Sequence, residues 1–372
     1  MRVKLEDVCE RGTSSLMQKD IVDKNGKYPV YGASGRIGSM ETYQQEHQTV
    51  AVVKDGAGIG RTMLLPEKSS IIGTMQYLIP KNCIEPEYLY YAVKYMHLEK
   101  YFSGATIPHI YFRDYKTEEF NLHNKTEQQE IISTLKRVEA VISNRREQLA
   151  MLDELVKARF VEMFGDPISN PFGFKVKTLQ KMIDDGTIMY HLDGNHGSDY
   201  PRNEEFVECG VPYISANCIV HNDVNLKLAK HLTEERASKL RKGIAQNGDV
   251  LFAHNATVGP VAILYTDDEK VILGTSLTAY RCDKERMVPD YLKAYMQSEG
   301  FVCQYTKDMK QTTRNQVPIT AQRKFLFVIP PLSLQNQFAA FVAEVDKSKA
   351  DVQKALDQTQ LLFDSLMQQY FG

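Results

Sequence analysis

The sequence of 372 residues lacks long apolar runs and lacks an excess of charge of either sign. No window approaches the roughly 18 uncharged apolar residues that a membrane span needs. The first residues, MRVKLEDVCERG, carry charges throughout and contain no apolar stretch of the kind found in secretory signals. We therefore expect a cytoplasmic protein that is long enough for two domains and their connecting elements.

Cysteine is scarce, and the six cysteines are scattered along the chain. They form no CxxC pair and have no histidine at the spacing of a zinc site. Their positions are Cys9, Cys83, Cys209, Cys218, Cys282 and Cys303. The sequence thus predicts reduced and mostly packed thiols, with no metal site.

Basic and acidic residues nearly balance, with 45 Lys and Arg against 47 Asp and Glu and a net charge of −2. A domain that binds nucleic acid through bulk charge is usually strongly basic. Charge alone therefore argues against a nucleic-acid role, and any contact with DNA must come from local patches.

No motif of an enzyme active site is recognisable. The glycines of 32–38 and 56–60 fit neither the dinucleotide fingerprint nor the P-loop, and turns explain them more simply. The only Pro-Pro pair, at 330–331, lacks the preceding Asn or Asp and the following aromatic residue of a DNA amino-methyltransferase. The acidic run 267–270 resembles a metal nuclease only superficially and is typical of a solvated hairpin turn. We expect no catalytic residue, metal or cofactor.

The sequence does contain a long internal repeat. Residues 124–165 align without a gap to residues 331–372, at a constant offset of 207. Apart from Pro331 at the start of the second segment, neither segment contains proline or an internal glycine, so each predicts one helix of about 35–40 residues and roughly 50–60 Å. The identical pairs are Gln128/Gln335, Val138/Val345, Leu149/Leu356, Leu155/Leu362, Phe164/Phe371 and Gly165/Gly372.

Apolar residues in both copies alternate at spacings of four and three, which is typical of a coiled-coil seam. Since helices of this length need a partner, each copy is the nearest candidate for the other. Arg145, Arg159 and Lys349 interrupt the pattern and either fix its register or extend from its edge. The seam comprises Ile131, Leu135, Val138, Ile142, Leu149, Leu152 and Val156 in the first copy, and Phe338, Val342, Val345, Val352, Leu356, Phe363 and Leu366 in the second.

The regions before the two helices also correspond, in the same order but with loops of different length. The matched segments are 29–38 with 212–220, 50–61 with 250–261, 71–79 with 272–280, and 86–94 with 289–297. Each region is expected to be α+β. The β-rich runs are 49–54, 70–79, 250–253 and 271–280, the Pro-initiated helices are 87–101 and 290–305, and the last extended pieces are 120–122 and 325–329.

Two globular domains thus alternate with two long helices. We place the boundaries at 1–123 for the first domain, 124–164 for the central helix, 165–330 for the second domain and 331–372 for the C-terminal helix. Residues 165–174, which contain two prolines and two glycines, mark the linker into the second domain.

Two polar segments at matching places in the domains are candidate DNA contacts. Residues 303–324 hold five basic residues against one acidic residue, and residues 103–116 correspond to them. Either segment alone is more simply a solvated loop, but their equivalent positions favour binding, with Arg314 suited to a guanine edge and Asn315 or Gln316 to an adenine. The full set of candidates is Ser34, Arg36, Lys54, Arg61, Thr106, His109, Tyr111, Arg113, Ser215, Asn217, Asn255, Thr257, Thr312, Thr313, Arg314, Asn315 and Gln316.

The whole pattern resembles the specificity subunit of type I restriction-modification systems. The resemblance is carried by the helix starts EQQEI and SLQNQF, the helix ends FVEMFGDPISNP and LMQQYFG, and the blocks VKDGAGIGR and PEYLYYAVK. It covers nearly the whole chain. In the second half, HNATVGP lacks the glycines of DGAGIG, and QNQF replaces the usual EQ pair.

This resemblance implies two target recognition domains that each read one half of a split DNA site. It also implies that the helices form an antiparallel coiled coil whose length sets the unread spacer, an arrangement whose pseudo-twofold matches the near-dyad of duplex DNA. The implied partners are double-stranded DNA, two modification subunits that bind S-adenosylmethionine and methylate adenine, and ATP-dependent restriction subunits. The chain itself would be a non-catalytic part of a prokaryotic defence system.

Two other functions remain open from the sequence. One is a stand-alone enzyme that modifies or cleaves DNA, which would need an active site and activity of the purified chain. The other is a helical scaffold that carries two protein-binding or glycan-binding domains, which would show no salt-dependent binding to duplex DNA.

Overall fold

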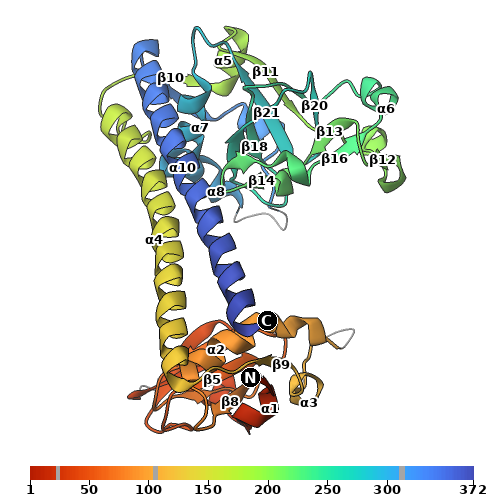
Figure 1. Ribbon diagram of the computed structural model, residues 1–372. Helices are drawn as coiled ribbons and strands as arrows, with labels where there is room; N and C mark the ends of the chain where they lie inside the picture. The colour runs from red at the N-terminus through yellow and green to blue at the C-terminus, as the bar shows by residue number, and fades with distance from the viewer. Residues whose placement is uncertain (22–25, 104–107, 310–314) are drawn as a thin grey trace. The chain divides into compact units, whose positions relative to one another are not determined.

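The computed structural model describes the chain except for residues 22–25, 104–107 and 310–314 (Figure 1). It divides into two compact units. Unit 1 comprises residues 1–147 and 352–372, and unit 2 comprises residues 148–351. Each unit therefore combines one β-rich domain with part of each of two long helices. Within the described ranges, no helix is both long and apolar enough to cross a membrane.

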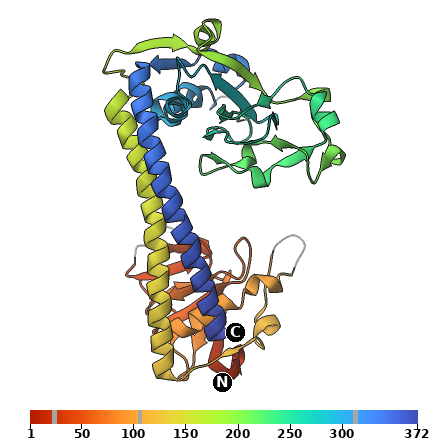
Figure 2. The same cartoon turned by 45° about the horizontal axis from the view of Figure 1, so that its top comes forward.

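The two long helices are α4 (Lys125–Phe164) and α10 (Leu332–Phe371) (Figure 2). Each has 40 residues, and both begin and end at positions that the repeat makes equivalent. The prediction of two uninterrupted, paired helices in an α+β fold is therefore confirmed. The first half of α4 lies in unit 1 with the second half of α10, and the reverse holds in unit 2, so the pairing is antiparallel.

Aromatic and ionic contacts join the helices within unit 2. The Phe338 ring lies 5.7 Å from the Phe160 ring and 5.5 Å from the Phe164 ring, between centroids. Lys349 Nζ reaches Asp153 Oδ1 across the pair at 2.5 Å. Two of the basic residues that interrupt the heptad pattern therefore contact the other helix: Lys349 makes an ion pair with Asp153, and the Arg159 guanidinium lies over the Phe341 ring of α10 at 5.6 Å.

Burial along the helices follows the predicted heptad positions near their N-terminal ends, as at Ile131 and Phe338, and shifts by one position near their C-terminal ends. Phe160 and Phe164 are buried near the end of α4, and Met367 and Phe371 are buried at the equivalent positions of α10. None of these four is among the seam positions expected from the heptad. The shift arises because the end of each helix packs against a domain core as well as against the other helix.

In unit 1 the domain contains a four-stranded sheet, a three-stranded sheet and one separate strand pair. The four-stranded sheet has the order β2 (Cys9–Thr13), β8 (Met75–Pro80), β5 (Thr49–Val53), β6 (Thr62–Leu65). The three-stranded sheet has the order β4 (Gly35–Met40), β3 (Tyr28–Gly32), β7 (Ser70–Ile71). The other elements include the pair β1 (Arg2–Lys4) and β9 (Glu119–Asn121), and the helices α1 (Leu5–Val8), α2 (Pro86–Tyr95), η2 (Leu98–Tyr101) and α3 (Phe112–Tyr115).

Unit 2 repeats this plan with a larger second sheet. Its four-stranded sheet has the order β11 (Ile188–Asp193), β21 (Leu277–Cys282), β18 (Val250–Ala253), β19 (Val261–Ile263). Its five-stranded sheet has the order β12 (Phe206–Val207), β16 (Lys230–Leu232), β13 (Val211–Ile214), β20 (Val271–Leu273), β17 (Ile244–Ala245). The other elements include the pair β10 (Lys175–Thr178) and β22 (Leu326–Ile329), the pair β14 (Ile219–Val220) and β15 (Asp223–Val224), and the helices α5 (Leu179–Asp184), α6 (Glu234–Ser238), α7 (Pro289–Gln297), α8 (Glu299–Met309) and α9 (Ile319–Gln322).

Several runs predicted as single elements are divided in the structure. The run 70–79 forms β7 and β8, and the run 271–280 forms β20 and β21, because in each case the chain passes from one sheet to the other. The predicted helices are interrupted at His97, which is left-handed with φ 51°, and at Ser298, which is extended. The acidic run 267–270 joins β19 and β20, which belong to different sheets, so it is not a hairpin turn.

Strand registers relate the two units residue by residue. Tyr31 pairs with Ile71 in unit 1, and Ile214, which aligns with Tyr31, pairs with Leu273 in unit 2. The offset in this segment is therefore 202. This corrects the alignment of 71–79 with 272–280 by one residue.

A buried glutamine at the start of each long helix explains one of the identical pairs. Gln128 Oε1 accepts a hydrogen bond from Glu85 N at 2.8 Å, and Gln335 Oε1 accepts one from Val288 N at 2.9 Å. Both side chains are fully buried. In each unit the glutamine thus ties the first turn of a long helix to the start of the Pro-initiated helix, α2 or α7.

Candidate nucleic-acid interface

In unit 1 the loop that follows β5 lies against the segment that precedes α3. Ile110 N donates to Lys54 O, and Gly56 N donates to Pro108 O, both at 2.9 Å. The loop is tight, and Gly56, Gly58 and Gly60 all have positive φ values between 79° and 90°. A Cβ atom at Gly60 would lie 2.5 Å from Glu99 N, so the glycine also permits a close backbone approach.

A row of charged and aromatic side chains runs along this junction. Lys54 Nζ lies 3.4 Å from Asp55 Oδ2, and the Asp55 carboxylate contacts the His109 ring. The His109 and Tyr111 rings have centroids 4.1 Å apart, and the Arg113 guanidinium lies 4.5 Å over the Tyr111 ring. Tyr111 and Arg113 are exposed, so the row presents a cation on an aromatic platform to solvent.

The hairpin of β3 and β4 extends the same surface. Arg61 Nη1 donates to Ala33 O at 2.8 Å, which brings Arg61 to the turn that carries Ser34. Arg61 O in turn accepts from Val53 N, next to Lys54. The side chains of Ser34, Arg36 and Arg61 are exposed. We name this set of loops the unit 1 cluster: residues 33–36, 54–61 and 108–113.

Unit 2 builds the same junction from its own segments. Val317 N donates to His254 O at 2.8 Å, and Ala256 N donates to Asn315 O at 3.0 Å. The isolated bridge between Asp55 and His109 has its counterpart in a bridge between Asn255 and Gln316. The two candidate DNA segments therefore occupy equivalent places relative to the sheet.

The segment after β13 is the third part of the equivalent group of loops in unit 2. Ala216 N donates to Ser276 Oγ at 2.8 Å, and Ser276 O accepts from His254 N at 2.9 Å. Ser215 Oγ donates to Asn217 Oδ1 at 2.9 Å beside this contact. We name residues 215–217, 254–259 and 315–317 the unit 2 cluster; Asn217, Thr257, Asn315 and Gln316 are exposed in it.

Four of the candidate residues, Thr106, Thr312, Thr313 and Arg314, lie outside the described residues. The structure also brings in a residue that the sequence candidates omit, Asp55. The alignment of 50–61 with 250–261 contains the signal for it, because Asp55 stands opposite Asn255, which is a candidate.

Two buried histidines lie beneath the unit 2 cluster. Burial lowers the pKa of His191 and of His254 to about 4, so both rings are neutral at pH 7. His254 Nδ1 lies 2.8 Å from Thr278 Oγ1, and His191 Nε2 lies 3.1 Å from Gln322 Oε1. By strand register, the unit 1 equivalent of His191 is Arg11, which is exposed, and the equivalent of His254 is Lys54.

The thiols divide evenly between buried and exposed. Cys9, Cys218 and Cys282 are buried, and burial raises the pKa of Cys9 and of Cys282 to about 12. Cys83, Cys209 and Cys303 are exposed, so the expectation of mostly packed thiols holds for only half of them. In the part of the chain that the structure describes, no three His, Cys, Asp or Glu side chains are placed to hold a metal ion.

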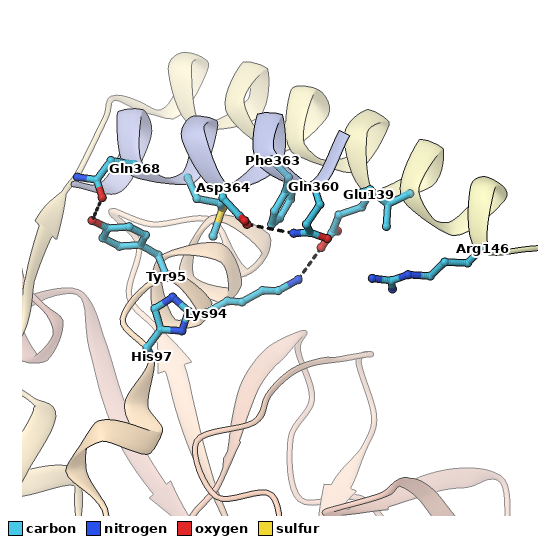
Figure 3. A pocket seen from close by; sticks show the side chains of 11 residues that line it. Lys94, Tyr95, His97, Glu139, Arg146, Gln360, Phe363, Asp364 and Gln368 are labelled. Carbon is cyan, nitrogen blue, oxygen red and sulfur yellow. Dashed lines mark hydrogen bonds and ion pairs between the residues drawn. The ribbon is translucent and has the colours of Figure 1, made fainter. Parts of the chain in front are cut away.

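Unit 1 also contains a hollow of about 730 Å³ between the end of α2 and the two long helices (Figure 3). Its polar side chains mainly satisfy one another: Lys94 Nζ donates to Glu139 Oε1 at 2.7 Å, and Tyr95 OH donates to Gln368 Oε1 at 2.9 Å. Unit 2 has a hollow of about 350 Å³ at the equivalent place, where apolar residues such as Val156, Phe160 and Ala294 form the lining. Both hollows are walled by helices and not by the two loop clusters.

Comparison with known proteins shows that part of the chain matches a known family. Residues 1–152 match the family model described as "Type I restriction modification DNA specificity domain". The first 152 residues are therefore similar to this family of specificity domains. The matched residues comprise the unit 1 domain, with its whole loop cluster, and the first part of α4.

Part of the chain is also similar to a curated protein, the Type I restriction enzyme MjaIX specificity subunit of Methanocaldococcus jannaschii. It is 27% identical over 154 residues, which cover 38% of this chain and 36% of the relative. The chain therefore matches about a third of that relative's length.

Two solved structures resemble the entire chain. The type I restriction-modification S subunit from M. genitalium has a TM-score of 0.58 and 16% identity, with 100% of this chain and 96% of that chain covered. A second chain, from a structural study of complex assembly and conformational transition of the type I R-M system, has a TM-score of 0.55 and 15% identity, with 100% and 97% covered. These likenesses show the fold: two β-rich domains and two long helices packed together.

Proposed function

We propose that this chain is the non-catalytic specificity subunit of a type I restriction-modification complex. In this function each loop cluster reads one half of a bipartite site in double-stranded DNA. The observation that carries the proposal is the presence of two equivalent clusters in a chain whose first domain matches a DNA specificity domain. A duplicated reader suits two half-sites, and different side chains at equivalent positions suit half-sites of different sequence.

In unit 1 the cluster supplies mainly cations and one carboxylate. Lys54, Arg61 and Arg113 would contact phosphates and so position the domain on the duplex. The pair of Asp55 and His109 lies between them and offers an acceptor for a cytosine amino group and a ring for a purine edge. We assign base reading in the first half-site to this pair.

In unit 2 the described part of the cluster supplies amides and hydroxyls. Asn255 and Gln316 lie side by side on the bridge that corresponds to Asp55 and His109. An amide side chain can make two hydrogen bonds to adenine, which makes this pair the base reader of the second half-site. Thr257 and Asn315 would add contacts from either side.

Partners follow from the same proposal. Two modification subunits would flip and methylate the adenines that this chain selects, and restriction subunits would cleave DNA. The domain boundaries at 123 and 330 and the two helices would then separate two readers, with the helix length setting the unread spacer. Inserting seven residues at equivalent places in α4 and α10 should change the spacer and leave both half-site sequences intact.

The test is methylation mapping in cells that express the chain with its cognate modification subunit. A bipartite methylated-adenine motif is expected, and it should disappear when the gene for this chain is removed. Asp55→Ala should relax only the first half-site, and Asn255→Ala only the second. Methylation without a bipartite motif, or equal relaxation of both halves by either variant, would overturn the proposal.

A further inference from the structure

We infer that a buried side-chain pair beneath each loop cluster positions that cluster for base reading: Gln76 with Tyr115 in unit 1, and Thr278 with Gln322 in unit 2. This inference rests on the proposed function. Neither pair reaches the surface, since all four side chains are at most 2% exposed. They are therefore positioning residues and do not contact DNA.

In unit 1 the pair joins the central sheet to α3. Gln76 lies on β8 and its Nε2 donates to the Tyr115 hydroxyl at 2.8 Å. Tyr115 ends α3, the short helix that begins one residue after Tyr111 and contains Arg113. The link therefore anchors the downstream end of the segment that supplies His109, Tyr111 and Arg113.

In unit 2 the pair occupies the same place, but the glutamine is on the short helix and not on the strand. Gln322 ends α9, and its Nε2 donates to Thr278 Oγ1 on β21 at 3.1 Å. Gln322 Nε2 also donates to Val317 O at 3.1 Å, and its Oε1 accepts from the Tyr280 hydroxyl at 2.6 Å. Gln322 thus connects the sheet directly to the residue that follows Gln316.

Strand register shows that these positions are equivalent. Gln76 pairs with Val52 and Thr278 pairs with Phe252, at the same step of corresponding ladders. One unit places glutamine on the strand and tyrosine on the helix, whereas the other places threonine on the strand and glutamine on the helix. Since the residue types differ and the buried link is retained, the link itself is what both units have in common.

The geometry explains why this link matters for the loops. Upstream, each segment is held to the neighbouring loop by two backbone hydrogen bonds, those of Ile110 and Gly56 in unit 1. Downstream, the buried pair fixes the short helix against the sheet. A buried donor that loses its partner is costly, so the helix should shift to restore a hydrogen bond and carry the base-reading side chains with it.

Tyr115→Phe tests the inference in unit 1, and Tyr88→Phe is its matched control. Tyr88 is also fully buried, and its hydroxyl donates to Asn121 O at 2.8 Å, which lies outside the cluster. Both variants remove one buried hydroxyl from the same unit. Tyr115→Phe should lower discrimination at the first half-site by about tenfold, the scale of one good base contact, with the second half-site unchanged.

The control should lower the melting temperature by a similar amount and leave the methylated motif unchanged. If both variants relax the motif equally, or Tyr115→Phe relaxes both halves, the link is merely structural and the inference is wrong. If Tyr115→Phe keeps full discrimination while the wild-type motif is bipartite, the inference fails and the proposed function stands. If the wild type has no bipartite motif, the proposed function fails first.

In unit 2 the corresponding variant is Gln322→Leu, with Gln335→Leu as a control of the same residue type and burial. The expected result is relaxation of the second half-site only, by about tenfold, for Gln322→Leu alone. Should Gln322→Leu fail to fold, Thr278→Val removes the same hydrogen bond with a side chain of similar shape. An intact second half-site in Thr278→Val would contradict the inference.

Discussion

The two loop clusters use one backbone arrangement with different side chains. The unit 1 cluster has Lys54, Arg61 and Arg113 around an aspartate and a histidine, whereas the described part of the unit 2 cluster has amides and hydroxyls. Beneath the loops the contrast is repeated, because His191 and His254 stand where unit 1 has Arg11 and Lys54. The comparison shows that both units keep the same backbone hydrogen bonds between their loops, whereas the side chains that the loops carry differ.

The largest expected effect concerns the helix packing that supports unit 2. Phe338→Ala should destabilise unit 2 by about 3–5 kcal/mol, because the ring is fully buried against Phe160 and Phe164. Hydrogen exchange of the unit 1 amides should remain nearly unchanged, since no unit 1 residue belongs to that core. Equal loss of protection in both units would show that they unfold together and would weaken the comparison between them.

The buried histidines should make unit 2 more sensitive to acid than unit 1. The folded pKa values of His191 and His254 are about 4, below the usual 6.5, so the unfolded chain binds protons that the folded chain does not. Stability should therefore fall as pH decreases from about 6.5 to about 4, by roughly 1–3 kcal/mol for each histidine. Asp193 lies near both rings and opposes part of this effect.

Unit 1 provides the control for this pH dependence, because Arg11 and Lys54 stand where unit 2 has the two buried histidines. Urea unfolding at pH 7, 5.5 and 4.5, followed by amide exchange, should show a decline confined to unit 2. The variant His191→Gln/His254→Gln should flatten that decline. A decline of the same size in the double variant would exclude the histidines as its cause.

Exchanging the residue types at Asp55 and Asn255 tests whether these side chains determine which bases each unit prefers. Asp55→Asn gives unit 1 the amide that unit 2 carries at Asn255, and should alter preference at one position of the first half-site by about 1–3 kcal/mol. Methylation mapping should show the second half-site unchanged, and Asn255→Asp should give the mirror result. A change in the half-site read by the other unit would reverse our assignment of units to half-sites.

The smallest expected effect is on salt dependence. Arg113→Ala should reduce the slope of log binding constant against log salt by about 1, because one phosphate contact is lost. Asn255→Ala should weaken binding and leave the slope unchanged, because an amide releases no counterion. The measurement is a titration of labelled duplex at several salt concentrations, and equal slopes in the two variants would remove the proposed difference between the clusters.

Much of the helical part could be predicted from the sequence, whereas the strands and the site could be predicted only in outline. The heptad pattern and the absence of proline and internal glycine predict helices that the structure extends over Lys125–Phe164 and Leu332–Phe371. Local composition predicts one continuous run over 70–79, because it does not reveal that the chain changes sheets between Ile71 and Met75. Asp55 is not among the sequence candidates although it aligns with the candidate Asn255, and its contact with His109 in the structure places it in the cluster.

By itself the sequence determined the duplication, the two long helices and an outline of the main strands and helices in each half, because periodicity and chain breakers act over short distances. Only the tertiary structure decided which polar residues meet. The contacts of Asp55 with His109 and of Thr278 with Gln322 join residues more than forty positions apart, and they form when sheet and helices are packed. The same packing moved burial from the heptad positions to Phe160 and Phe164, because there α4 faces a domain core as well as a partner helix.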